Sequence, residues 1–188
     1  LVLLAAPGLP GREVLADQLE DIGRSRGMDR RALAVQRGTQ QRIFEALTQE
    51  ADSAAIATEL KQIMRDTQGI SGEEAIEQQV QQLTSPWFRF FVSYDPRPAL
   101  RQVDVPVLAL TGSNDLQVAA DTNLAAIESA LKSGQNPPHT VRVVDGLNHL
   151  LQPSETGAVS DYGRIETTLA PRVLEEIAVW IRDQSPER

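Results

Sequence analysis

The fold of this chain is decided by the stretch VPVLALTGSNDLQV, residues 105–118. Its first six residues form a continuous apolar run of strand length, and a polar turn ending at Asp115 follows at once. A run of this kind is typical of a parallel strand covered on both faces. A second strand is expected at 140–144, after an amphipathic helix over 121–132, and the turn DGLNH, residues 145–149, follows it. This alternation predicts an α/β fold with a few parallel strands and flanking helices.

The rest of the chain divides around this unit. Residues 1–6 form another apolar strand, and a helical pattern extends from about residue 10 to residue 83. Apolar residues recur at i, i+4 and i+7 in three places, which are Leu15, Leu19 and Ile22; Ile56, Leu60 and Ile63; and Ile76, Val80 and Leu83. A longer helix is expected over 29–50, and Ser71 with Glu74 resembles a capping box. Pro171 is expected to begin a closing helix with Leu174, Ile177 and Ile181 on its inner face.

Composition excludes several classes of function. The 188 residues carry a net charge of −8 at pH 7, which disfavours binding to nucleic acid or to anionic lipid surfaces. No apolar run approaches the roughly 18 residues of a membrane-spanning helix. Cysteine is absent and there are two histidines, so neither a disulfide nor a metal site is expected. No signal-peptide pattern is present, and the sequence leaves the localisation undetermined.

Two titratable residues follow the two central strands. Asp115 lies in the turn after the first, and His149 lies in the turn after the second. Reactive groups of open α/β sheets gather at the carboxyl ends of the strands, so the two side chains are expected to meet. A carboxylate that holds one imidazole nitrogen leaves the other free to accept a proton from a hydroxyl nucleophile. Each residue alone also fits a simple turn role, and Asp145 is a rival for the acid.

Four further residues are candidates for substrate contacts. Gln117 and Asn148 adjoin the reactive pair, where they could orient a substrate or support the loops, and simple turn roles fit them equally well. Trp87 and Phe88 belong to an aromatic cluster that ends at Tyr94. These rings could anchor the helical segment to the core, which is the favoured interpretation, or line an acyl pocket.

Residues 105–118 resemble the strand and acid loop of α/β-hydrolases, in which the final aspartate is the triad acid, and Gly146 to His149 resembles their histidine loop. The nearest group is the EstD-like bacterial carboxylesterases, with a Tyr-Gly pair matched by Tyr162-Gly163 and a final Ala-Pro-Val-Leu helix matched by 170–174. The resemblance implies the C-terminal half of an α/β-hydrolase fold. Residues 1–9 would form a core strand and turn, residues 10–95 a helical cap, and residues 96–188 the remaining core.

The resemblance also implies a carboxylesterase that acts through an acyl-enzyme on a small acyl ester, without a cofactor. No G-x-S-x-G elbow occurs in the chain, so the serine is expected upstream of Leu1. The 188 residues alone are therefore expected to be inactive. They would associate with the missing N-terminal half or with one another through the strand Leu1–Ala6. A peptidase or acyltransferase of the same fold, or a non-catalytic binding module, are the alternatives.

Overall fold

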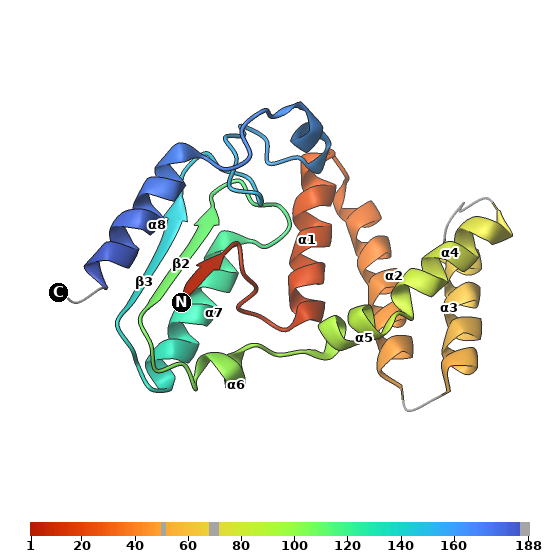
Figure 1. The fold of residues 1–188 in the computed structure, drawn as a ribbon. Helices are drawn as coiled ribbons and strands as arrows, with labels where there is room; N and C mark the ends of the chain where they lie inside the picture. Colours follow the sequence, from red (N-terminus) through yellow and green to blue (C-terminus); the bar gives the residue numbers. More distant parts are fainter. Residues whose placement is uncertain (50–51, 68–71, 185–188) are drawn as a thin grey trace.

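The computed structural model describes residues 1–49, 52–67 and 72–184, and these contain a three-stranded sheet flanked by helices (Figure 1). The strands are β1 (Val2–Leu4), β2 (Val107–Gly112) and β3 (His139–Val144), in the order β1-β2-β3. Both pairings are parallel, with Leu4 opposite Leu110 and Leu110 opposite Arg142. The predicted α/β class with few parallel strands is therefore confirmed. Each strand was expected within one or two residues of its observed bounds.

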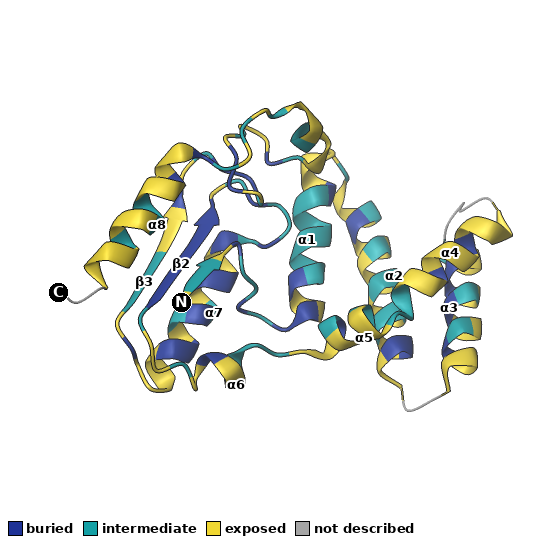
Figure 2. Cartoon of the chain, in the orientation of Figure 1, coloured by how far each residue is buried: buried dark blue, intermediate teal, exposed yellow. Residues whose placement is uncertain are grey.

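The central strand β2 is buried on both faces, and this burial accounts for the apolar run Val107 to Leu110. All of its residues are buried. Helix α7 (Ala120–Ser133) covers one face, and helix α8 (Pro171–Asp183) covers the other (Figure 1). Because side chains alternate along a strand, Val107 and Ala109 pack towards α7, whereas Leu108 and Leu110 pack towards α8. Figure 2 shows this concentration of buried residues along β2 and the inner side of α7.

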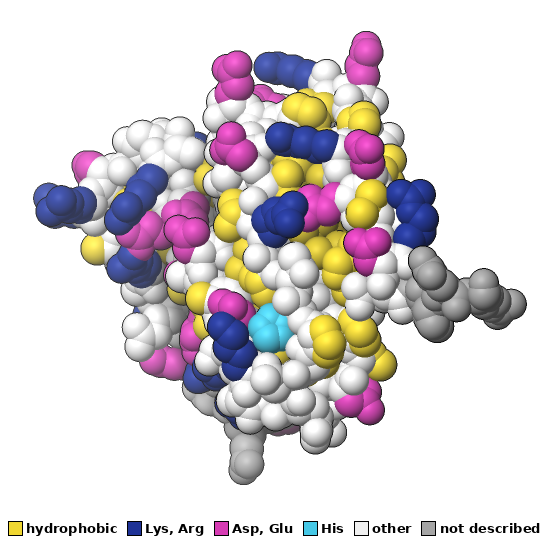
Figure 3. Space-filling view, turned by 90° about the vertical axis from the view of Figure 1, so that its left-hand side faces the viewer, with side chains coloured by type: hydrophobic (Ala, Val, Ile, Leu, Met, Phe, Trp, Pro, Cys, Tyr) yellow, Lys and Arg dark blue, Asp and Glu magenta, His cyan; other side chains and the backbone are white. Residues whose placement is uncertain are grey.

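The closing helix begins at Pro171 as expected, but only Ile177 of its predicted inner face packs against the sheet. Val173 is fully buried against the sheet, with Ile177 and Trp180 packed beside it. Leu174 is 55% exposed and Ile181 is 49% exposed. Both sets follow helical spacing, so the helix carries apolar side chains on two faces, and the face with the larger Trp180 packs on the sheet. Figure 3, which views the molecule from this side, shows hydrophobic side chains exposed among charged ones.

The predicted helical segment consists of α1 (Gly11–Ser25), α2 (Arg30–Thr48), α3 (Ser53–Thr67), α4 (Glu73–Leu83) and α5 (Pro86–Ser93). Helix α2 begins where Asp29 accepts a hydrogen bond from the backbone of Ala32 at 2.8 Å. The predicted capping box includes Ser71, which lies outside the described residues; α4 itself begins at Glu73, after Gly72. The helices enclose a core of their own, formed by Ala46, Leu47, Ile56, Leu60, Ile63, Met64, Ile76, Val80 and Val92.

Two short elements complete the described fold, α6 (Arg97–Leu100) before β2 and a 3-10 helix, η1 (Val159–Arg164), before α8. Helix α1 lies beside α7, where Thr122 donates a hydrogen bond to Asp17 at 3.2 Å. In the described part of the chain, no helix is long and apolar enough to cross a membrane.

Candidate active site

Asp115 lies in the turn that follows β2, and its carboxylate is held from several directions. One oxygen, Oδ1, accepts hydrogen bonds from the backbone N–H groups of Gln117 and Val118, both at 2.9 Å. The side chain has no exposed surface. Backbone donors aimed at a carboxylate fix its orientation. The turn therefore presents the second oxygen, Oδ2, in one direction.

His149 lies in the loop after β3, which is supported by Asn148. The buried Asn148 side chain accepts hydrogen bonds from the backbone of Leu150 and Gln152, both at 3.0 Å, and its amide donates to Gln152 at 3.1 Å. All these contacts lie within the loop. The Asn148 side chain therefore supports the histidine loop, and a contact of Asn148 with substrate stays a prediction.

The histidine loop is packed closely against the end of β2. The backbone of Asn114 donates to the carbonyl of Leu147 at 2.9 Å. A Cβ at Gly112 would lie 2.1 Å from the same carbonyl oxygen, so only glycine permits this approach. The close packing carries His149 over the acid turn.

Asp115 and His149 meet as expected. Oδ2 of Asp115 lies 2.9 Å from Nδ1 of His149, within the range anticipated for a preformed pair. An ionised carboxylate only accepts, so Nδ1 carries the proton, and neutral imidazole then leaves Nε2 as a proton acceptor. The His149 side chain is 26% exposed. Among the described residues, no serine or threonine hydroxyl is hydrogen-bonded to the imidazole ring.

The rival acid, Asp145, is not part of this pair. It is exposed, and its carboxylate accepts a hydrogen bond from Ser113 at 3.3 Å. The Ser113 hydroxyl in turn accepts from the backbone of Gly146 at 2.8 Å. Asp145 and Ser113 thus join the two turns, and Asp145 has a structural role there.

Tyr162 is a member of the site that the sequence did not identify. Its hydroxyl accepts a hydrogen bond from the side chain of Gln117 at 2.8 Å. Burial raises the pKa of the Tyr162 phenol, and the nearby Asp115 carboxylate raises it further, while hydrogen bonds from Gln117 and the His149 backbone lower it in part. The phenol therefore lies close enough to the Asp115–His149 pair to feel the charge of Asp115. Only the resemblance of the Tyr-Gly pair pointed to this position.

Trp87 and Phe88 are not brought to the pair. The residue after α5, Tyr94, contacts the first residue of α1, where the Gly11 backbone donates to its carbonyl at 3.2 Å. The acid turn borders the other end of α1 (Figure 1). A helix of 15 residues is about 22 Å long. Phe88 packs on the helical core, and Trp87 is 68% exposed and stacks on Phe91 with ring centroids 5.4 Å apart.

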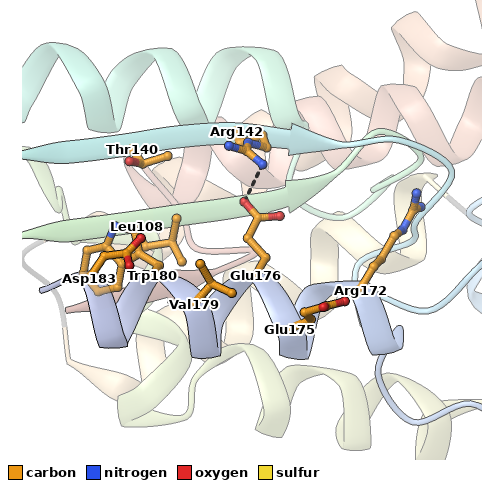
Figure 4. Close-up of a pocket in the computed structure, with 9 residues that line it drawn as sticks. All are labelled: Leu108, Thr140, Arg142, Arg172, Glu175, Glu176, Val179, Trp180 and Asp183. Atoms are coloured by element: carbon orange, nitrogen blue, oxygen red, sulfur yellow. Dashed lines mark ion pairs between the residues drawn. The ribbon is translucent and has the colours of Figure 1, made fainter.

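One cavity borders the acid turn, and another borders the sheet. One, of about 290 Å³, lies between the end of α1 and η1, and Leu116, Ile22 and Val159 contribute to its lining. The other, of about 440 Å³, is a groove between β3 and α8, crossed by an ion pair of Arg142 with Glu176 at 2.9 Å (Figure 4). The described residues contain no cluster of three or more side chains that could hold a metal ion.

Comparisons with protein-family models, with curated proteins and with solved structures found no match to this chain. What the structure defines is therefore an α/β protein with a parallel sheet and an aspartate–histidine pair at the carboxyl ends of two neighbouring strands.

Proposed function

We propose that this chain is the C-terminal portion of a serine hydrolase, and that Asp115 and His149 are the acid and the base of its catalytic triad. The observation that carries the proposal is the 2.9 Å contact between Oδ2 of Asp115 and Nδ1 of His149. A carboxylate with no exposed surface is held by three donors and fixes one imidazole tautomer. This is the arrangement that general-base activation of a hydroxyl requires.

In the proposed reaction, a serine from residues upstream of Leu1 attacks the ester carbonyl. His149 accepts the serine proton at Nε2, while Asp115 stabilises the imidazolium that forms. His149 then donates this proton to the departing alcohol, which leaves an acyl-serine. Water attacks the acyl group, loses a proton to Nε2, and releases the acid as the serine regains its proton.

The preference for a carboxylic ester comes from the resemblance of residues 105–118 and 146–149 to EstD-like carboxylesterases. A peptidase or acyltransferase uses the same acid and base, and a binding module could retain the same frame without turnover. The partner in this account is the polypeptide that carries the serine, paired along β1. Self-association through the same strand is the alternative.

An active-site-directed fluorophosphonate tests the proposal on a polypeptide that extends upstream of Leu1. We expect a covalent adduct on one serine upstream of this chain, and we expect His149→Ala to abolish it. His139→Ala is the matched control, because His139 hydrogen-bonds the Pro137 carbonyl at 2.7 Å and lies outside the site. Labelling that survives His149→Ala, or no labelling at all, contradicts a serine hydrolase. A panel of esters and peptides then separates the enzyme classes.

A further inference from the structure

Gln117 joins two hydrogen bonds that connect separate parts of the chain. Its backbone N–H donates to Oδ1 of Asp115 at 2.9 Å, and its side-chain amide donates to the Tyr162 hydroxyl at 2.8 Å. The other oxygen of Asp115 contacts His149 at 2.9 Å. A continuous series of hydrogen bonds therefore extends from Tyr162 through Gln117 and Asp115 to His149.

The segment that carries Tyr162 is fixed over the acid turn by contacts of its own. The side chain of Asn114 donates to the carbonyl of Ser154 at 2.7 Å. A Cβ at Gly157 would lie 1.9 Å from the carbonyl oxygen of Asn114, and Gly157 has a φ of +69°. Only glycine permits this approach and this backbone conformation. The loop that carries Tyr162 is thus held against both the side chain and the backbone carbonyl of Asn114.

We propose that Tyr162 is a positioning residue of the candidate active site, and that its hydroxyl holds the 115–118 turn so that Asp115 keeps His149 in the Nδ1–H tautomer. This inference rests on the proposed function in taking His149 as the base. Tyr162 acts through Gln117 on the acid turn, and its phenol also faces the backbone of His149. Without its hydroxyl, the Gln117 amide loses its acceptor, the turn can rotate, and the two backbone donors on Asp115 weaken.

The phenol is suited to this task because it stays protonated. Burial and the Asp115 charge both raise its pKa, so it remains neutral throughout the range in which an imidazole can act as a base. A neutral phenol beside the carboxylate adds no negative charge to the site. A carboxylate in the same place would repel Asp115 and could not hold the turn in this way.

The test is ¹⁵N NMR of His149 in the 188-residue chain, at a pH where the ring is neutral. His139→Gln leaves His149 as the single histidine. Free imidazole side chains prefer the Nε2–H tautomer, so a dominant Nδ1–H signal reports the Asp115 contact. We expect Tyr162→Phe to lower the ratio of Nδ1–H to Nε2–H about threefold to tenfold, the scale of one neutral hydrogen bond.

Gln117→Ala should produce the same change from the other end of the hydrogen bond, and it keeps the inference testable if Tyr162→Phe does not fold. Tyr94→Phe is the matched control and should leave the ratio unchanged, because Tyr94 stacks on Phe90 away from the site. Unchanged ratios in both Tyr162→Phe and Gln117→Ala, with Asp115→Asn still altering the tautomer, overturn the role of Tyr162 alone. A tautomer that Asp115→Asn also leaves unchanged overturns the proposed acid–base pair.

Discussion

Oδ2 of Asp115 lies 2.9 Å from Nδ1 of His149, although the two residues are 34 positions apart in the sequence. The contact arises because each residue follows one of two adjacent parallel strands, β2 and β3, which end at the same edge of the sheet. Gly112 then allows the histidine loop to approach the end of β2. The contact between Asp115 and His149 thus follows from the strand order and from the glycine at position 112.

The 188-residue chain by itself is expected to lack esterase activity. No described serine or threonine hydroxyl is bonded to the His149 ring, so the pair has no nucleophile to activate. Hydrolysis of short activated esters by the purified chain should equal that in buffer, and the His149→Ala chain should behave identically. Turnover that His149→Ala abolishes would refute this expectation.

Tyr162 should ionise at higher pH than an ordinary tyrosine, because burial and the Asp115 charge disfavour its phenolate. Absorbance titration of a Tyr94→Phe chain isolates this residue, since the sequence has two tyrosines. We expect Asp115→Asn to lower the pKa of Tyr162 by removing the charge, and Gln117→Ala to raise it by removing a hydrogen bond to the phenolate. Shifts in the opposite directions contradict the arrangement.

The raised pKa of Tyr162 also predicts how the free energy of unfolding changes at alkaline pH. The phenol of Tyr162 has a higher pKa in the folded chain than its ordinary value of 10.0. Its contribution is therefore fully present below pH 10 and is lost as the pH rises through the folded pKa. In the Tyr94→Phe background, Tyr162→Phe should make the free energy of unfolding less dependent on pH in this range.

Two adjacent residues of α8 test which face of the helix is packed. Val173→Ala should lower the free energy of unfolding by about 2 kcal/mol, because it removes two methyl groups from a fully buried position. Leu174→Ala removes a larger side chain that is 55% exposed, and it should change stability by less than about 0.5 kcal/mol. Chemical denaturation measures both. The reverse order would restore the inner face that the sequence predicted.

Periodicity predicted the existence of α8 but not its orientation. Two sets of apolar residues on this helix are spaced equally well for a buried stripe. One is Leu174, Ile177 and Ile181, and the other is Val173, Ile177 and Trp180. The choice depends on how the larger indole fits over Leu108 and Leu110, which no local pattern records. Strand β2 was easier to predict, because it is buried on both faces and its first four residues are all apolar.

The site was predictable to the same extent. Asp115 and His149 follow predicted strands, so topology alone was enough to bring them together. The hydrogen bond between Gln117 and Tyr162 joins a turn to a 3-10 helix 45 residues later. Contacts between loops of this kind leave no periodic pattern in the sequence. Trp87 and Phe88 show the converse, because their aromatic character suggested a pocket while α5 packs at the far end of α1.

Strand β1 is expected to recruit a further strand. It pairs with β2 on one side, no described strand pairs with its other side, and its exposed Leu1 and Leu4 are apolar. Light scattering should show self-association of the purified chain or a bound second polypeptide. Leu4→Lys should reduce association, whereas Leu174→Lys on the outer face of α8 should not. A monodisperse monomer of 20.6 kDa contradicts the expectation.

The central claim is that Asp115 orients His149 as the base of a serine hydrolase. The most direct measurement is kcat for ester hydrolysis by the protein that includes the upstream serine, compared between the unsubstituted form and Asp115→Asn. An asparagine amide that donates to Nδ1 leaves the imidazole in the wrong tautomer, so kcat should fall by up to roughly 10⁴-fold. An Asp115→Asn protein within about threefold of the unsubstituted kcat would contradict the account, since a loss that small is under 1 kcal/mol.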